Sequence, residues 1–175
     1  MENSDSLVSI IIPTFNRACC IENAIESVTR QSGKNWELII IDDGSTDNTS
    51  LIVREYLGDL RIKYYFQENR GVSAARNLGA EYAAGDYLIF LDSDDYLVPD
   101  LVEKLSEENF TNYDILCWQV LKNINGKETL LKPTPLDGLY NNITASFLAG
   151  SVCYKKEVFV TKRRYFLKSE VLTQK

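Results

Sequence analysis

Apolar runs alternate with amphipathic segments along the first two thirds of the chain. The apolar runs predict four strands, at residues 7–12, 36–41, 61–67 and 87–91. The segments after them carry apolar residues at helical spacing and predict four helices, at 16–30, 46–57, 71–82 and 99–105. A strand followed by a helix, repeated in this way, predicts an α/β fold in which helices cover both faces of a mostly parallel sheet.

Individual residues mark the expected ends of these elements. Pro13 cannot donate a ladder hydrogen bond, so we expect it to mark the exit of the first strand. Ser45 or Thr46 is expected to cap the second helix, and Asp47 suits the positive end of its dipole. Gly71 is expected to open the third helix, whose predicted buried face consists of Val72, Ala75, Leu78 and Tyr82.

The pattern changes after about residue 110. A strand is predicted at 113–120, and a turn at 123–126 leads to an antiparallel return at 128–131. A short helix is expected at 140–149 and a short strand at 151–155. We find no internal repeat and no linker, so residues 1–175 are expected to form a single domain with a small antiparallel C-terminal part.

Charge and composition exclude several classes of function. The net charge is −6, which argues against binding nucleic acid through a broad basic surface. The sequence contains no histidine, so Ser-His-Asp catalysis and the usual zinc sites lack their residues. The four cysteines form no C-x-x-C pair and are expected to be reduced thiols of a cytoplasmic protein.

The last sixteen residues, 160–175, mix basic with aromatic side chains. Such an end can make peripheral contact with an anionic membrane surface, including the inner face of a cell membrane. A solvated helix or a frayed tail is the alternative.

Acidic residues crowd the end of the fourth strand. Asp92, Asp94 and Asp95 follow its apolar run within four positions, with Ser93 between the first two. Two carboxylates about 4 Å apart repel by roughly 4 kcal/mol at an effective dielectric near 20, so a positive partner is expected. We interpret Asp92 and Asp94 as ligands of a divalent cation, Mn²⁺ or Mg²⁺. A polar turn that faces water is the alternative.

Polar residues also follow the first two strands, at 14–17 and 42–43. The carboxyl ends of parallel strands meet at one edge of a sheet, where ligands bind. No glycine-rich phosphate loop follows the first strand. A phosphate at this edge would therefore need a metal and a basic side chain, and Arg76, near a helix start, is the candidate.

Four motifs together resemble the family 2 glycosyltransferases of the GT-A fold. They read VSIIIPTFNR, IIIDDGSTD, NRGVSAARNLG and FLDSDD, and they occur in that order. The resemblance implies transfer of a sugar, with inversion, from a nucleotide-diphosphate sugar to an acceptor hydroxyl in glycan synthesis. A UDP-sugar donor and a glycan or lipid-linked acceptor are expected. It also divides the domain into a nucleotide-sugar-binding half, 7–110, and an acceptor-side half, 111–175, which looks incomplete.

The resemblance assigns roles to individual residues. The nucleoside pocket would be lined by Pro13, Thr14 and Phe15. Asp43 would accept a hydrogen bond from a uracil-like edge, with Asp42 nearby. Arg76 would lie along the nucleotide and its phosphates. Asp92 would face the ribose or the sugar, with Ser93 beside it, and Asp94 would ligate the metal that bridges the diphosphate.

Simpler interpretations of some of these residues stay open. Ser93 serves equally as a spacer, Asp42 as an acid that caps the next helix, and Arg76 as an exposed helix arginine. For Arg17, a surface charge and a ligand contact are equally compatible with the sequence.

The catalytic base is the part that the resemblance does not supply. Relatives carry it on an acidic pair downstream, whereas Glu170 is the only acid after Phe159 in this chain. The chain is therefore expected to be shortened relative to the family. Two hypotheses follow: an active transferase that uses Glu170, or a nucleotide-sugar-binding module with little or no activity. A nucleotidyltransferase would want a glycine-rich basic loop, which is absent.

Overall fold

The structure is a computed structural model and describes residues 6–107, 115–117, 120–124, 127–131 and 152–161. Its centre is a six-stranded sheet in the order β3-β2-β1-β4-β8-β5, and β6 and β7 form a separate hairpin. The strands are β1 (Val8–Thr14), β2 (Trp36–Asp42), β3 (Ile62–Phe66), β4 (Tyr87–Phe90), β5 (Ile115–Cys117), β6 (Val120–Ile124), β7 (Lys127–Leu131) and β8 (Val152–Lys155). The helices are α1 (Ile21–Thr29), α2 (Thr49–Arg54), α3 (Val72–Tyr82), α4 (Leu101–Glu107) and α5 (Lys156–Thr161).

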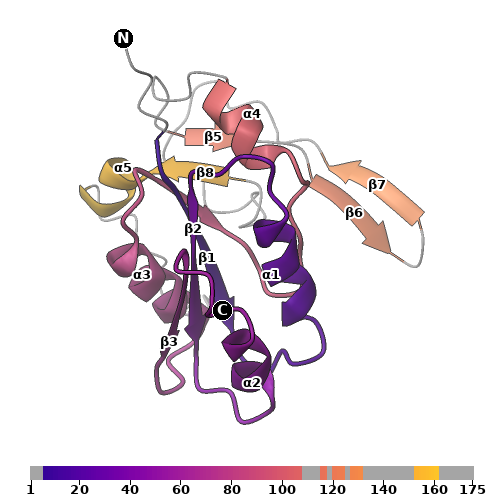
Figure 1. The fold of residues 1–175 in the computed structure, drawn as a ribbon, viewed down its shortest axis with the longest axis vertical. Helices are drawn as coiled ribbons and strands as arrows, with labels where there is room; N and C mark the ends of the chain where they lie inside the picture. Colours follow the sequence, from indigo (N-terminus) through magenta and orange to yellow (C-terminus); the bar gives the residue numbers. More distant parts are fainter. Residues whose placement is uncertain (1–5, 108–114, 118–119, 125–126, 132–151, 162–175) are drawn as a thin grey trace, which may run out of the picture.

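The direction of the strands confirms the expected fold class. The strands β3, β2, β1 and β4 run parallel, whereas β8 pairs antiparallel with both β4 and β5. Figure 1 shows the sheet at the centre, with α1 and α2 on one side and α3 on the other. Within the described residues, no helix combines the length and the apolar character that crossing a membrane requires.

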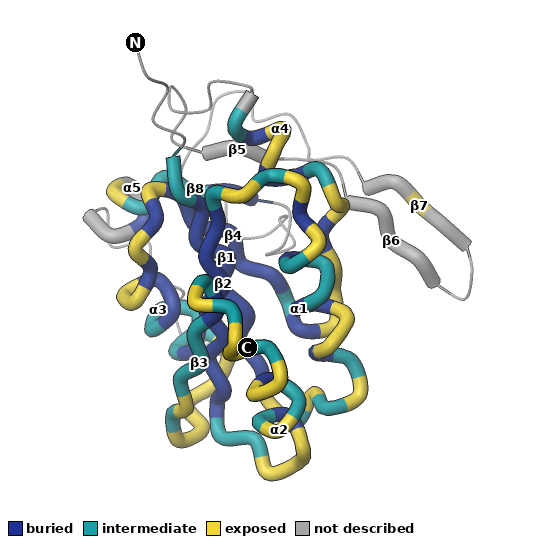
Figure 2. The backbone as a smooth tube through the Cα atoms, viewed as in Figure 1, coloured by how far each residue is buried: buried dark blue, intermediate teal, exposed yellow. Residues whose placement is uncertain are grey.

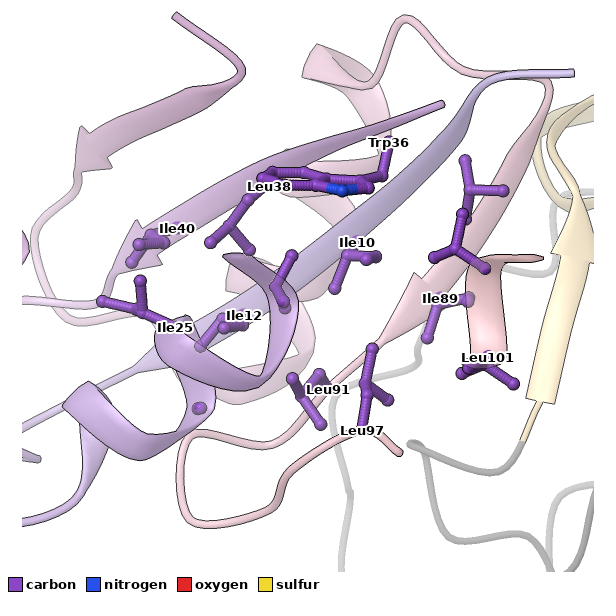
Figure 3. Packing of buried hydrophobic residues seen from close by; sticks show 14 of the residues in the cluster. Ile10, Ile12, Ile25, Trp36, Leu38, Ile40, Ile89, Leu91, Leu97 and Leu101 are labelled. Carbon is purple, nitrogen blue, oxygen red and sulfur yellow. The ribbon is translucent and has the colours of Figure 1, made fainter. Parts of the chain in front are cut away.

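Two apolar clusters lie on opposite faces of the sheet because successive strand residues point in opposite directions. One cluster packs α1, α2 and α4 against alternate residues of the central strands, including Ile10 and Ile12 of β1 (Figure 3). The other packs α3 and α5 against residues that include Ile11 and Phe90. The central strands are therefore buried on both faces (Figure 2), which accounts for their unbroken apolar runs.

The first strand continues past Pro13, contrary to the prediction. Pro13 pairs with Ile41, and Thr14 pairs with Asp42. Successive residues of a strand bond to opposite neighbours, and the carbonyl of Ile11 accepts from Leu91 on the β4 side. Pro13 therefore faces the β4 side too, where strand pairing has already ended. Its missing N–H costs no ladder bond, so the strand runs on.

The predicted helices exist, but their ends differ. The first, expected from residue 16, begins at Ile21 because Asn16 adopts a positive φ of 51° and turns precede the helix. The second has no side-chain cap from Ser45 or Thr46, since the Ser45 hydroxyl accepts from the Asn16 N–H instead. Ser45 thus serves a contact between loops, whereas Asp47 lies at the helix start as predicted and accepts from the Thr49 N–H at 2.9 Å.

The third helix buries only part of the expected face, on which Leu78 packs against the core as predicted. Ala75 is buried as predicted, but Val72 is 50% exposed and Tyr82 is 46% exposed. Gly79 is buried instead, and a Cβ atom there would overlap the side chain of Ile11. Small residues let α3 lie close to β1, which turns its larger residues toward the rim.

The C-terminal predictions are confirmed in part. The strands β6 and β7 pair antiparallel as predicted, although Asn123 and Ile124, which were expected in the turn, belong to β6. The strand β8 falls within the predicted strand at 151–155. The single strand expected at 113–120 is wrong, since β5 and the start of β6 belong to different sheets. The helix predicted at 140–149 and most of the basic end lie outside the described residues.

A buried carboxylate ties the amino-terminal edge of the sheet together. Glu37 accepts hydrogen bonds from the Ser9 hydroxyl at 2.6 Å, the Lys63 ammonium at 2.7 Å and the Ala84 N–H at 2.5 Å. Burial opposes ionisation of Glu37, but these hydrogen bonds outweigh it and hold its pKa below the ordinary value. The ionised carboxylate therefore links β1, β2 and β3 to the segment that enters β4.

We expect Glu37→Gln to lower the free energy of unfolding at pH 7 by about 1–3 kcal/mol, because the Lys63 and Ala84 donors lose their charged acceptor. A lowered folded-state pKa gives stability that is complete above the unfolded pKa, near 4.3, and is lost as pH falls through the folded pKa. Urea unfolding should thus show the difference shrinking toward pH 3. Glu26→Gln, which removes the exposed pair with Arg30, is the control and should change little. An equal difference at both pH values would contradict this role.

Candidate functional site

A cavity of about 450 Å³ opens at the carboxyl edge of the parallel strands. Its walls come from the segments that follow β1, β2 and β4 and from the start of α3. The lining residues are Pro13, Thr14, Phe15, Arg17, Asp43, Asn69, Gly71, Val72, Arg76, Asp92, Ser93 and Asp94. This position is where ligands bind in open α/β sheets.

Most of the predicted site residues meet in this cavity. Eight line it: Pro13, Thr14, Phe15, Asp43, Arg76, Asp92, Ser93 and Asp94. Asp42 does not line it, and Glu170 lies outside the described residues. Four further lining residues were not assigned to the site from the sequence: Arg17, Asn69, Gly71 and Val72.

Asp42 is fully buried behind the cavity wall. One carboxylate oxygen accepts from the Tyr64 hydroxyl at 2.7 Å, and the other accepts from the Ser45 N–H at 2.8 Å. Burial, followed by the hydrogen bond to Asp42, raises the pKa of Tyr64 above its ordinary value, so the phenol stays a donor. Asp42 therefore fixes the loop after β2 rather than facing the cavity.

Asp43 lines the cavity and also organises its far wall. Oδ1 accepts from Gln67 Nε2 at 2.5 Å and from the Arg70 N–H at 2.8 Å. Oδ2 accepts from the Gly71 N–H at 2.8 Å. A carboxylate has about four acceptor sites, so one site on Oδ2 is left after these three bonds. Asp43 can therefore hold the loop before α3 and still accept from one N–H donor of a ligand.

Thr14 places a hydroxyl at the base of the cavity. The residue is 3% exposed, and among the described residues its Oγ1 has no hydrogen-bond partner. A buried hydroxyl without a partner costs roughly 1–3 kcal/mol. Thr14 belongs to the cavity lining, but its Oγ1 atom is itself buried from solvent.

Arg76 and Asp92 form an ion pair across the cavity wall. Arg76 Nη2 donates to Asp92 Oδ1 at 2.5 Å, and the arginine side chain is only 14% exposed. This excludes the alternative of an exposed helix arginine. The pair also orients Asp92, which leaves its second oxygen for other contacts.

Negative charge accumulates beside this pair. Burial and the charges of Asp92 and Asp94 raise the pKa of Asp95 above its ordinary value. Carboxylate oxygens suit Mn²⁺ and Mg²⁺, so Asp92 and Asp94 fit such an ion. No cluster of three or more acidic, thiol or imidazole groups able to hold a metal occurs among the described residues. The protein would then contribute one or two ligands, and phosphate oxygens would complete the shell.

These features agree with the family to which the chain belongs. The family described as "Glycosyl transferase family 2" matches residues 9–171, so the chain is a member of it. It spans 15% to 50% of the length of eight curated relatives that it matches. The family resemblance seen in the four motifs is thereby confirmed.

Individual relatives agree with this assignment. An Escherichia coli protein named UDP-Glc:alpha-D-GlcNAc-diphosphoundecaprenol beta-1,3-glucosyltransferase WfgD is 44% identical over 100 residues, which cover 57% of this chain and 39% of that protein. Residues 1–349 of Staphylococcus aureus TarS, in complex with UDP-GlcNAc, superpose with a TM-score of 0.77 at 25% identity, over 92% of this chain and 48% of that one. The likeness confirms the GT-A-type fold.

A second solved structure shares the fold alone. The mannosyltransferase PcManGT from Pyrobaculum calidifontis, in complex with GDP-Man and Mn²⁺, has a TM-score of 0.68 at 20% identity. The superposition covers 95% of this chain and 48% of that one.

The buried hydroxyl of Thr14 leads to a prediction about stability without ligand. Thr14→Val keeps the shape and removes the unpartnered hydroxyl, so the free energy of unfolding should stay the same or rise by roughly 1 kcal/mol. Thr49→Val is the matched control and should lose about 1–2 kcal/mol, since the Thr49 hydroxyl donates to Asp47 and accepts from the Arg17 N–H. Chemical unfolding measures both. Similar losses in the two variants would mean that the Thr14 hydroxyl has a partner within the protein.

Proposed function

We propose that this chain binds a nucleotide-diphosphate sugar, with UDP favoured, and transfers the sugar with inversion to an acceptor hydroxyl in glycan synthesis. The observation that carries this proposal is the convergence of eight predicted donor-site residues in one cavity. The UDP-GlcNAc bound to TarS and the UDP-Glc in the name of WfgD support a UDP-sugar donor.

The nucleoside would occupy the part of the cavity between β1 and the loop before α3. The remaining acceptor site of Asp43 suits the N–H of a uracil ring, and Thr14 forms part of the wall beside it. Phe15 is 44% exposed at the cavity rim, where an aromatic face can stack on the base. Pro13 shapes the wall between these groups.

The diphosphate would lie toward Arg76, Asp92 and Asp94. Gly71 and Val72 place the N-terminus of α3 in the same wall, where the helix dipole favours anions. A divalent ion held by Asp94, with Asp92, would neutralise charge on the leaving diphosphate. Mn²⁺ in the PcManGT structure supports the choice of ion. Arg76 would keep Asp92 oriented and face the phosphates, and Ser93 would space the two acids.

The acceptor would approach the open side of the sugar. Inversion requires one displacement, in which a carboxylate removes the proton of the acceptor hydroxyl as it attacks. Glu170 is the candidate that the sequence offers. The diphosphoundecaprenol in the name of WfgD supports a lipid-linked acceptor, and a cytoplasmic protein at the inner membrane face suits such an acceptor.

A binding module without transfer is the second candidate function. It stays the alternative because Glu170, the candidate base, lies outside the described residues. Donor binding is expected under both functions, so turnover distinguishes them.

The metal prediction follows from the small number of protein ligands. Titration calorimetry should show Mn²⁺ binding weakly to the protein alone and at least tenfold more tightly with UDP present, because phosphate oxygens complete its shell. Asp94→Asn should abolish this coupling. Asp95→Asn removes the same charge one residue further on, outside the lining, and should preserve it. UDP binding that is equally tight with and without Mn²⁺ would refute the role of Asp94.

The base prediction concerns turnover alone. With UDP-GlcNAc or UDP-Glc and an acceptor, Glu170→Gln should lower the rate of UDP release by about 10²-fold or more and leave UDP affinity unchanged, because a general base acts only as the acceptor attacks. An unaltered rate would place the base elsewhere. Absence of turnover in the unmodified chain, with intact UDP binding, would favour the binding module.

A further inference from the structure

The loop after β1 is bonded along its length to the loop after β2. The Asn16 N–H donates to the Ser45 hydroxyl at 2.8 Å, and Asn16 Oδ1 accepts from the Thr46 N–H at 2.8 Å. Asn16 makes both bonds with a positive φ of 51°, a conformation that asparagine tolerates better than most residues. These two bonds of Asn16 set the direction in which the chain leaves β1.

Asp47 and Thr49 make a second set of contacts between the two loops. Asp47 Oδ2 accepts from the Ala18 N–H at 3.0 Å, while Oδ1 accepts from the Thr49 hydroxyl at 2.5 Å. The Thr49 oxygen in turn accepts from the Arg17 N–H at 2.9 Å. Thr49 is fully buried, so the backbone of Arg17 is anchored to the protein interior. We call these contacts of Asn16, Asp47 and Thr49 the loop clamp.

The clamp holds the backbone between two exposed side chains of the cavity wall, those of Phe15 and Arg17. Among the described residues, the cations of the lining are Arg17 and Arg76. Arg76 is paired with Asp92, whereas no ion pair of Arg17 is found within the described part of the chain. The positive charge of Arg17 is thus available at the rim.

Arg17 lines the same cavity as Asp92 and Asp94. Burial and the Cys19 thiol raise the pKa of Cys20 to about 11; the charge of Asp94 adds to this rise and that of Arg17 opposes it. Because Arg17 and Asp94 both line this cavity, an anion bound there by a metal on Asp94 would share the cavity with the Arg17 guanidinium.

We propose that Arg17 is a diphosphate contact of the donor site and that the loop clamp is the device that positions it. The proposal rests on the proposed function and adds a cation to the rim, beside Asp94 and apart from the buried pair of Arg76 with Asp92. A guanidinium forms two parallel hydrogen bonds with phosphate oxygens, which fixes orientation as well as adding affinity. Because Arg17 is exposed when no nucleotide sugar is bound, its charge is desolvated only when the diphosphate binds.

Comparing UDP, UMP and uridine isolates this contact. Arg17→Ala should lower the affinity for UDP by about fivefold to tenfold and the affinity for UMP by less. The affinity for uridine should not change, since uridine carries no phosphate. Arg17→Lys should retain part of the UDP affinity because it keeps the charge without the bidentate geometry. Arg54→Ala removes an equal charge from an exposed position on α2, and this variant should bind all three ligands like the unmodified protein. Calorimetry suits UDP, and ligand-observed NMR titration suits uridine.

The role of the clamp is tested by coupling. Thr49→Val should lower the affinity for UDP and leave the affinity for uridine unchanged. Thr49→Ser, which restores the hydroxyl, should recover the UDP affinity. In Arg17→Ala/Thr49→Val the UDP loss should equal that of Arg17→Ala alone, because both changes remove one contact. Fully additive losses would show that the clamp acts by another route and would overturn the positioning role.

The two levels of proposal fail differently. If the unmodified chain does not bind UDP, the proposed function and this contact are both wrong. If the unmodified chain binds UDP, two results would overturn the diphosphate contact alone. One is that Arg17→Ala binds UDP equally well, and the other is that its affinities for UDP and uridine fall to the same extent.

Discussion

The site depends on the parallel pairing of β1 with β2 and on the hydrogen bond that extends it. The pairing runs from Val8 with Trp36 to Thr14 with Asp42, and the Asp43 N–H then donates to the Thr14 carbonyl at 2.8 Å. This places Thr14 and Asp43 next to each other where the two strands leave the sheet. A shift of one residue in this register would separate them and turn the side chains of the shifted strand to the opposite face.

Two acids in sequence have separate tasks because they point to opposite faces of β2. Asp42 is buried and bonded on both oxygens, so it holds the loop that follows β2. Asp43 reaches across to the segment before α3 and keeps one acceptor site at the cavity. Together with the loop clamp, these bonds make the cavity wall a set of loops that brace one another. Such a wall needs little ordering when a ligand binds, which favours affinity.

Charge is balanced locally at the phosphate end of the cavity. Arg76 offsets Asp92 through a short ion pair, while Asp94 and Asp95 keep a negative surplus that suits a divalent ion. On the opposite edge of the sheet, Glu37 and Lys63 form a second charged network whose role is stability. The protein thus uses charge at both ends of the strands, for binding at one end and for holding strands together at the other.

The sequence alone determined the strand–helix order, the parallel sheet and most of the cavity residues, because apolar period and motif order are local properties. Helix starts, the path of β1 past Pro13 and the buried face of α3 were decided by tertiary contacts, in particular bonds between loops and the close approach of Gly79 to Ile11. Tertiary structure also decided the roles of Asp42 and Arg17. The sequence could not separate a supporting residue from a lining residue at these positions, whereas the fold buries Asp42 and places Arg17 in the cavity lining.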